Sequence, residues 1–465
     1  MLLACIALYL VLNLGVGLWA SRRVKTTEDF VLAGRRLSFG LATMVTFATW
    51  FGSETMMGAP AQFVGGGLLA VIEEPFGAAL ALILVGLVYA KIFYRLNIIT
   101  FCDFFRNRFG RSAEVLSAAL IVPSYFGWIA AQFVAMGVIG QVIFGVSLQT
   151  GILVGAGLVT FYTLTGGMWS ISITDFLHNL ILIAGLGILT YLLLDRVGGL
   201  KNVLAAQPPG FFRFIPKTFS WQSSADYFVA WATIGLGSIP QQDIFQRVMA
   251  AKSERVAVRS SVTAGVLYLT VALLPLLIAL IALRLYPELR QGDLKLIIPT
   301  MVLRHAPLFV QVMFFGALVS ALLSTASGAI LAPAAVTGEN LVKQFYPNLN
   351  DKQSLAVIRM SVLGVAAAAV WMALARQDIF ELVSESSAFS LVSLFVPMTA
   401  GLYWKRANRL GCLLSMGLGW GVWFLCLRLG TVFPPVLYGL TASLTGLIVG
   451  TWAEKPMASS LSKVR

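Results

Sequence analysis

Apolar residues along this chain fall into long runs that short polar stretches separate. A helix needs ~20 apolar residues to cross a bilayer, and most of these runs approach that length. We mark thirteen such segments, which begin near Leu2, Ser38, Gly66, Ala113, Leu148, Ile171, Ala225, Val256, Leu308, Ser354, Ile379, Gly411 and Pro434. The pattern predicts an all-α polytopic membrane protein with about 13 transmembrane helices.

Two of these segments contain residues that interrupt a helix at membrane depth. They are Gly52, Gly58 and Pro60 in the second segment and Gly235, Gly237 and Pro240 in the seventh. Unwound backbone inside a bilayer is tolerated only where it is buried or lines a cavity. Segments two to six and seven to eleven form two blocks of five, and because five is odd the second block crosses in the opposite sense. Matched breaks in two inverted repeats are typical of the binding site of a secondary transporter.

The composition agrees with a membrane protein. Only 11% of the 465 residues are charged and the mean hydropathy is +0.86, whereas soluble domains carry roughly 25% charged residues, so soluble enzymes and nucleic-acid binders are excluded. The net charge of +13 indicates orientation instead, because 22 of the 33 basic residues fall on loops and a tail that are cytoplasmic if the amino terminus is outside. We therefore expect a multi-pass protein of the cell membrane (the bacterial inner membrane), with its carboxyl terminus inside.

The chain is expected to form one transmembrane domain over residues 1–465. Its parts are an extra helix and cytoplasmic loop (1–37), a first inverted repeat (38–195), a second (223–404) and carboxyl-terminal helices (405–453). No phosphate-binding loop of the GxxxxGK[ST] type occurs, which disfavours ATP-driven transport. Four cysteines without a CxxC pair and two histidines far apart predict no resident metal or cofactor. No nucleic acid or required protein partner is indicated.

The ninth segment allows two interpretations. Ser320, Ser324 and Gly328 share one helix face, which favours close helix packing. The neighbouring hydroxyls of Ser324 and Thr325 would equally present hard oxygen atoms to a small cation such as sodium. The residues alone leave both interpretations open.

Several acidic and aromatic residues lie at membrane depth, where a carboxylate is costly and is usually paired, protonated or functional. The acidic residues are Glu54, Glu73, Glu74 and Glu385. They would bind a substrate ammonium group or relay protons, or they are paired internally. The aromatic residues are Trp50, Tyr125, Phe126 and Trp128. These would line an apolar cavity or pack in the core.

Five sequence motifs together resemble the sodium:solute symporters, which include bacterial sodium/proline and sodium/galactose transporters. They are the segments 29–35, 100–110 and 162–167 (followed by Thr174-Asp175), the run Gln242-Asp-Ile-Phe-Gln-Arg247, and Ser324-Thr325. The resemblance covers about residues 25 to 406. It implies a LeuT-like core of two inverted five-helix repeats, in which the first helix of each repeat is broken.

The resemblance also implies a sodium site between the second and ninth segments. Its ligands would be the backbone carbonyls of Ala48, Phe51 and Ala321 and the hydroxyls of Ser324 and Thr325. Asp175 is implied to gate or couple ion movement; otherwise it is a helix cap or the partner of a cytoplasmic arginine.

The substrate is not fixed by the resemblance. Trp50 replaces the aspartate of the proline symporter, Ser384 the glutamine of the sugar transporter and Gly237 its aromatic gate, so neither proline nor a hexose is inferred. We expect the substrate to contact residues of the second, fourth, seventh and eleventh segments, namely Trp50, Ser53, Glu54, Gln132, Gly237, Ser384 and Glu385.

The predicted function is that of a sodium-coupled secondary active symporter, not an enzyme, that imports a small organic solute by alternating access. The solute would be amino acid-like or another small metabolite. One alternative keeps the fold but couples transport to protons through Glu54 or Glu385. A transporter-like solute sensor and a membrane enzyme are weaker alternatives, since no signalling module and no nucleophile beside a base is visible.

Overall fold

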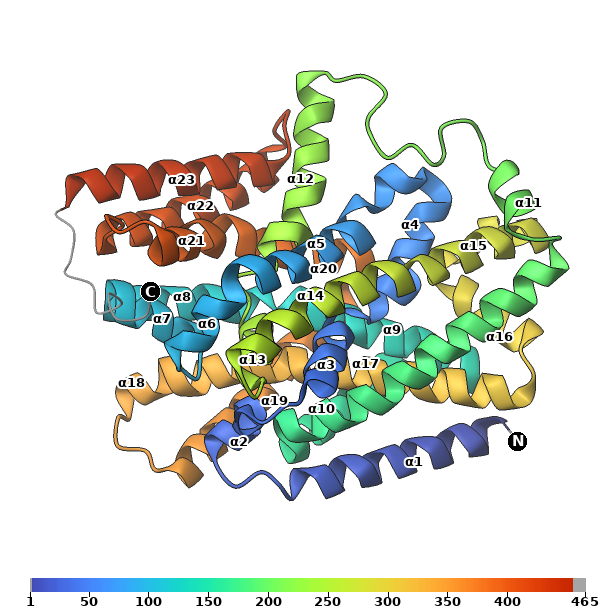
Figure 1. Ribbon diagram of the computed structural model, residues 1–465, viewed down its shortest axis with the longest axis horizontal. Helices are drawn as coiled ribbons and strands as arrows, with labels where there is room; N and C mark the ends of the chain where they lie inside the picture. Colours follow the sequence, from blue (N-terminus) through green and yellow to red (C-terminus); the bar gives the residue numbers. More distant parts are fainter. Residues whose placement is uncertain (1, 455–465) are drawn as a thin grey trace.

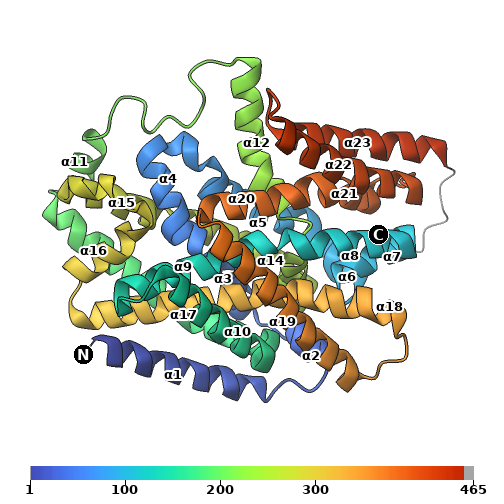
Figure 2. The same cartoon turned by 180° about the vertical axis from the view of Figure 1, so that it is seen from behind.

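The helices of the computed structural model, which describes residues 2–454, lie largely side by side, with the longest of them running in the same general direction (Figure 1). Every element in this part of the chain is helical. The first turn of α1 and the last turn of α23 lie at opposite ends of the bundle, as both views show (Figures 1 and 2). The basic tail residues Lys455, Lys463 and Arg465, which we predict to be cytoplasmic, lie outside the described residues.

The first half of the chain, up to the long connection before residue 221, contains eleven α-helices. They are α1 (Leu2–Ser21), α2 (Thr27–Leu32), α3 (Phe39–Trp50), α4 (Ala59–Gly66), α5 (Ala78–Leu84), α6 (Ala90–Leu96), α7 (Phe101–Phe109), α8 (Arg111–Ser124), α9 (Phe126–Phe144), α10 (Leu148–Arg196) and α11 (Leu200–Ala205). Wider, π-type turns connect α3 to α4, and α5 to its neighbours on both sides.

The second half begins with another interrupted helix. Its α-helices are α12 (Trp221–Gly237), α13 (Gln242–Ala250), α14 (Glu254–Val271), α15 (Leu273–Leu285), α16 (Ile297–His305), α17 (Leu308–Val336), α18 (Lys343–Phe345), α19 (Asp351–Ala375), α20 (Ile379–Ser390), α21 (Val396–Tyr403), α22 (Arg409–Leu429) and α23 (Pro435–Ala453).

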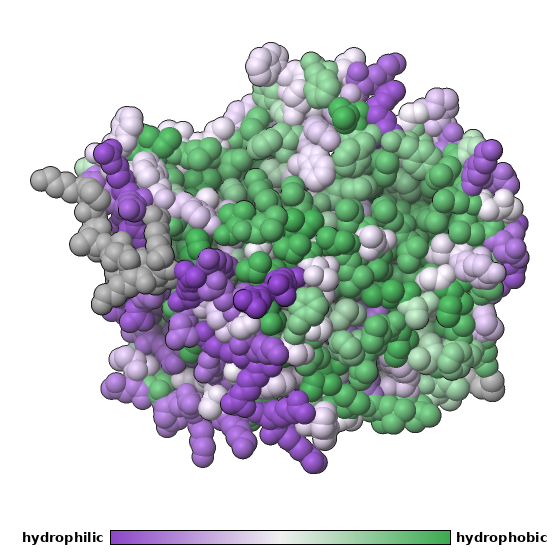
Figure 3. Space-filling view, in the orientation of Figure 1, coloured by the Kyte–Doolittle hydropathy of each residue, from purple (hydrophilic) through white to green (hydrophobic). Residues whose placement is uncertain are grey.

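Ten helical stretches among the described residues are long and apolar enough to cross a membrane, and two shorter apolar helices, Phe39–Trp50 and Leu148–Leu164, accompany them. The predicted membrane class is therefore confirmed, whereas the count of 13 stays a prediction. Figure 3 shows hydrophobic side chains over the middle of one face of the bundle, with hydrophilic ones gathered mainly at its lower left and fewer at its right edge. This distribution is typical of a bilayer-spanning protein, whose polar residues concentrate outside the hydrocarbon region.

The predicted break in the second segment lies just after Trp50. Phe51 leaves the helical conformation (φ −82°, ψ 71°), and helical geometry resumes as a π-type turn over Glu54–Gly58 that leads into α4. The amide of Gly52 bonds to the carbonyl of Trp50 at 2.9 Å instead of to Ala48, four residues back. The carbonyl of Ala48 is thereby freed from the helix, as at any helix carboxyl terminus.

The predicted break in the seventh segment separates α12 from α13. Helix α12 ends at Gly237, four non-helical residues follow, and α13 begins at Gln242. Pro240 has no amide hydrogen to donate, which favours a chain reversal or break at this point.

Helix α10 joins two predicted segments without a loop. The chain bends at Gly167, whose φ of 55° is favourable only for glycine, and a side chain there would lie 2.5 Å from the ring of Phe30. A single residue thus makes the turn between the segments predicted to begin near Leu148 and Ile171.

Helix α17 forms the centre of the bundle. All residues from Phe314 to Val336 are buried, and the helix contacts α1, α9, α10 and α19. Its many alanines and serines let these neighbours approach closely, which is how helices associate inside a membrane.

Candidate functional site

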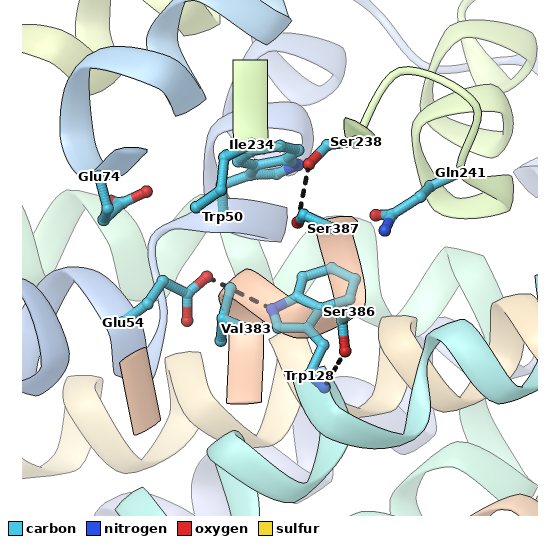
Figure 4. Close-up of a pocket in the computed structure, with 10 residues that line it drawn as sticks. All are labelled: Trp50, Glu54, Glu74, Trp128, Ile234, Ser238, Gln241, Val383, Ser386 and Ser387. Atoms are coloured by element: carbon cyan, nitrogen blue, oxygen red, sulfur yellow. Dashed lines mark hydrogen bonds between the residues drawn. The ribbon is translucent and has the colours of Figure 1, made fainter. Parts of the chain in front are cut away.

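A narrow cavity of about 10 Å³, barely enough for one water molecule, lies where the two breaks meet. Figure 4 shows its lining, which combines two tryptophans, two carboxylates and several small polar groups. The lining residues are Trp50, Glu54, Glu74, Trp128, Ile234, Ser238, Gln241, Val383, Ser386 and Ser387. Both interrupted helices, together with α9 and α20, therefore contribute to one site.

Glu54 stands in the first turn after the break and is buried. Its carboxylate accepts three hydrogen bonds, from Ser53 Oγ (3.1 Å), Gln132 Nε2 (3.0 Å) and the indole Nε1 of Trp128 (3.3 Å). All three donors are neutral, so they orient the carboxylate without cancelling its charge.

Gln132 holds the first break in place. Its Oε1 accepts the backbone amide of Ser53 at 3.0 Å, while its Nε2 donates to Glu54. Gly52 makes this contact sterically feasible, because a side chain there would lie 2.8 Å from the same Oε1 atom. Ser53 and Gln132, both expected to contact the substrate, lie outside the cavity lining and fix the position of Glu54 by hydrogen bonds.

Glu74 is the second carboxylate of the cavity. Its Oε1 accepts hydrogen bonds from Thr55 Oγ1 (2.9 Å) and from the phenol of Tyr268 on α14, while its Oε2 has no hydrogen-bond partner in the described structure. The sequence marks Glu74 as an acidic residue at membrane depth but gives no indication of these contacts, since Tyr268 is almost two hundred residues away.

Neither carboxylate forms an ion pair with a basic side chain in residues 2–454, although Glu54 and Glu74 are 3% and 1% exposed. Burying an uncompensated charge is expensive, and such groups are usually paired, protonated or used to bind a cation. The cavity therefore has an acidic character that the surrounding protein does not neutralise.

The two tryptophans give the cavity its aromatic surface. Trp50 closes α3 and Trp128 lies near the start of α9, where its backbone amide donates to Ser386 Oγ at 2.9 Å. The indole nitrogen of Trp50 has no hydrogen-bond partner among the described residues. Of the other candidate aromatics, Tyr125 lies outside the lining and hydrogen-bonds to Asp243.

Helix α20 presents a different face to the cavity than the sequence predicts. Val383, Ser386 and Ser387 line it, whereas Ser384 and Glu385 do not. Glu385 instead forms an ion pair with Arg376, with nitrogen–oxygen distances of 2.6 and 2.9 Å. Each residue turns a helix by about 100°, so a shift of one or two positions faces another direction. The expected contact of Ser384 and Glu385 with the substrate stays a prediction.

Gly237 is also absent from the lining, and its position explains why. A side chain there would lie 2.3 Å from the carbonyl of Ser387, so the glycine lets α12 pack directly against α20. The next residue, Ser238, reaches the cavity and its hydroxyl lies 3.3 Å from that of Ser387.

Of the predicted sodium ligands, Ala48 and Thr325 contact each other between the first break and α17. Thr325 Oγ1 donates to the freed carbonyl of Ala48 at 3.0 Å, and the buried Ser324 hydroxyl has no hydrogen-bond partner in the described structure. Phe51, the residue that follows α3 at the break, and Ala321 on α17 are both buried. A freed carbonyl, an unpartnered hydroxyl and a second hydroxyl suit a hard monovalent cation, so the donor chemistry fits sodium.

Asp175, on α10, lies close to Ser324 of the candidate sodium site. It is buried, and its carboxylate lies close to the Ser324 hydroxyl without a hydrogen bond between them and acts electrostatically on the guanidinium of Arg247 on α13. Arg247 is itself buried and donates to Thr49 Oγ1 at 2.9 Å. Asp175 lies within α10 and does not cap it, and it stands between the candidate ion site and the buried Arg247.

Two interrupted helices around a central cavity define a transporter fold. The structure resembles a Na⁺-coupled sialic acid symporter with a TM-score of 0.84 at 20% identity, covering 98% of this chain and 99% of the other. It also resembles MhsT in complex with L-phenylalanine, with a TM-score of 0.60 at 14% identity over 90% and 99% of the two chains.

The family model of the sodium:solute symporter family matches residues 30–419, and the chain belongs to this family. The human high affinity choline transporter 1 is 28% identical over 437 residues (88% of this chain, 74% of that protein). Sodium/proline symporter 2 of Staphylococcus saprophyticus is 27% identical over 505 residues (99% and 95%). The predicted family is confirmed, and so is the expectation that the protein is a transporter and not an enzyme.

Proposed function

We propose that this protein is a sodium-coupled symporter that imports a small organic cation by alternating access. The observation that carries the proposal is the pair of buried carboxylates, Glu54 and Glu74, which share one cavity with two tryptophans and have no basic partner among residues 2–454. A substrate ammonium group supplies the missing positive charge.

Glu54 is the proposed anchor of the substrate charge. Among residues 2–454, its Oε1 receives a hydrogen bond only from Trp128, at the long distance of 3.3 Å, so it keeps capacity for a further donor. Gln132 and Ser53 bind the other oxygen atom and fix the orientation of the carboxylate. This arrangement favours a cationic solute over a neutral or anionic one.

The tryptophans support the same class of substrate. An ammonium group within about 6 Å of an indole ring is attracted by the ring quadrupole, with a gain of ~2 kcal/mol when the site is desolvated. Several relatives of this chain are high-affinity choline transporters, and choline is a quaternary ammonium compound. Other relatives transport proline, which carries a carboxylate as well as an amine. The acidic cavity therefore favours the choline transporters as the better guide to the substrate of this protein.

Sodium is the proposed coupling ion, bound by the Ala48, Phe51 and Ala321 carbonyls and the Ser324 and Thr325 hydroxyls. Its binding would tie the broken α3 to α17 and so favour one of the two alternating arrangements, since a ligand shifts an equilibrium toward the state that it binds better. Asp175 is proposed to assist ion release toward the cytoplasm through its contact with Ser324.

We further propose that the fold comprises two inverted five-helix repeats with broken first helices and 13 spans in all. The amino terminus would face outward and the carboxyl terminus the cytoplasm of a bacterial cell. The helices α1 and α23 start and end on opposite sides of the bundle, which an odd number of spans requires (Figure 1).

A matched pair of solutes tests the substrate class. Choline and 3,3-dimethylbutan-1-ol have nearly the same shape, but only choline is charged. We expect choline to shift the melting temperature of the purified protein in NaCl, and less so in KCl, and the neutral alcohol to have no effect. Equal shifts from both compounds, or no response to any of a panel of small amines, would contradict the proposal.

A further inference from the structure

Asn13 is a buried amide on α1, the helix that precedes the first interrupted helix. It stands in the middle of an apolar stretch and is 9% exposed. Its Nδ2 donates to Ser320 Oγ of α17 at 3.1 Å, and its Oδ1 lies 2.5 Å from His178 Nε2 of α10. One side chain of α1 therefore connects two other helices, and we call these three residues the Asn13 bridge.

All three side chains of the Asn13 bridge are shielded from water. Ser320 and His178 are 0% and 2% exposed. A buried polar group that loses its partner finds no water to replace it, so the loss of either contact leaves an unpaired polar atom. Polar side chains at membrane depth are expensive for this reason, and they serve helix association or function.

The Asn13 bridge lies one helical turn from the candidate ion site on both helices. On α17, Ser320 precedes the expected sodium ligand Ser324 by four residues. On α10, His178 follows Asp175 by three residues. Residues at these spacings share one face of a helix, and Asp175 itself lies close to Ser324. The bridge therefore joins α10 and α17 next to the point where both helices approach the ion site.

Close packing on either side of Asn13 seats α1 against both helices. Tyr9, one turn earlier, lies against Gly316 of α17, where a side chain would come within 2.6 Å of the tyrosine ring. The carbonyl of Gly17, one turn later, accepts a hydrogen bond from Ser170 Oγ of α10 at 2.5 Å. Figures 1 and 2 show α1 beside α10 and α17 along much of its length. Residues spaced by four along α1 thus form the face that contacts the core.

We propose that Asn13 is a positioning residue for sodium, an inference that rests on the proposed sodium coupling. Through Ser320 and His178 it holds α17 and α10 at the separation that the ion site needs. A binding site requires its donors within about 0.5 Å of the productive geometry, so a small change in this separation weakens the ion. Helix α1, which lies outside the two predicted repeats, is then part of the ion-binding machinery.

A purely structural role for Asn13 predicts a different result. A hydrogen bond that only joins helices stabilises the protein equally with and without sodium, so its loss lowers the melting temperature and leaves sodium affinity unchanged. The hydroxyls of Ser415 and Ser443 form such a bond between α22 and α23, at 2.8 Å and fully buried. These two helices and α1 lie at opposite edges of the bundle (Figure 1). Ser443→Ala is therefore the matched control.

Two measurements on the purified full-length protein in detergent test the inference. One is the dissociation constant of ²²Na⁺, with KCl holding the ionic strength constant, and the other is the melting temperature in KCl alone. We expect Asn13→Leu to weaken sodium binding about tenfold, the equivalent of ~1.4 kcal/mol. Ser443→Ala should lower the melting temperature but bind sodium like the wild type.

Two substitutions at His178 separate the hydrogen bond from the volume of the side chain. His178→Leu removes the partner of Asn13 and should weaken sodium binding as Asn13→Leu does. His178→Gln keeps an N–H donor for the Asn13 oxygen and should bind sodium nearly as the wild type does. The double variant with leucine at both positions should be no weaker than either single variant, because the bridge is lost only once.

The outcomes separate the role of Asn13 from the proposed function. A wild-type sodium constant in Asn13→Leu would overturn the positioning role and leave sodium coupling in place. Equal weakening by His178→Gln and His178→Leu, or by Ser443→Ala, would overturn it as well. If Asn13→Leu does not fold, Ser320→Ala removes only the acceptor of the Asn13 amide, and an unchanged constant there contradicts the inference. No sodium binding by the wild type would overturn sodium coupling itself.

Discussion

The side-chain amide of Gln132 lies 3.0 Å from the carboxylate of Glu54 and, through its oxygen, holds the amide of Ser53 at the break after α3. A helix interruption and a buried charge are therefore stabilised by one residue of α9. This connection makes the geometry of the cavity dependent on a side chain that does not itself line it.

Replacing Gln132 by leucine should destabilise the protein and impair the cavity together. The change leaves the Ser53 amide and one Glu54 oxygen with fewer partners, and each lost bond of this kind costs about 1–3 kcal/mol. We expect a lower melting temperature and weaker binding of any solute that stabilises the wild type. Gln132→Glu, which keeps the size and the acceptor but adds a charge beside Glu54, should be worse; a wild-type melting curve in both variants would contradict the role.

Glu54→Gln should selectively weaken the binding of a cationic solute. The substitution keeps the shape and removes the charge, and a hydrogen bond to a charged group contributes roughly 1.5–3 kcal/mol, or about 10- to 100-fold in affinity. Isothermal titration with choline or a responding amine measures the effect. The control is Glu385→Gln, whose ion pair with the half-exposed Arg376 lies outside the cavity and contributes at most about 1 kcal/mol; it should bind like the wild type.

Ser324→Ala and Thr325→Ala should each weaken the sodium dependence of substrate binding. Either change removes an oxygen donor from the group that includes the freed Ala48 carbonyl. The sodium concentration that gives half-maximal stabilisation should rise by about tenfold or more. Thr190→Ala serves as the control, because its hydroxyl donates to the Leu186 carbonyl of its own helix at 2.7 Å, away from the candidate ion site. Unchanged sodium activation in both site variants would rule out this ion site.

Gly237→Ala should disrupt the contact between the two halves of the cavity. The added methyl group would lie 2.3 Å from the Ser387 carbonyl, and neither backbone can move without displacing α12 from α20. Overpacking of this kind costs about 1–3 kcal/mol, so the melting temperature should fall. Gly157→Ala in α10 has no atom within 4 Å of the added carbon and should leave stability unchanged or slightly higher.

Asp175→Asn should change ion handling more than folding. Arg247 would keep Asp243 as a counter-charge, so the buried arginine stays compensated. The interaction with the Ser324 hydroxyl would lose its charge, and the rate at which bound ²²Na⁺ exchanges should change relative to the wild type. An exchange rate identical to that of the wild type would argue against a coupling role for this residue.

The sequence by itself determined the class of protein, the interrupted segments and the family. Apolar runs and sparse charge require a bilayer, and closely spaced glycine and proline residues weaken a helix, so these properties are local and need no tertiary information. The motifs around Asp175, Arg247 and Thr325 identify the family for the same reason.

The tertiary structure alone decided which groups face one another. The sequence identifies Glu74 as a costly acid but not its contact with Tyr268, because that contact depends on how α14 packs against the first break. It predicts Ser384 and Glu385 where the cavity has Val383, Ser386 and Ser387, since the rotation of a helix is set by packing against its neighbours and not by its own residues.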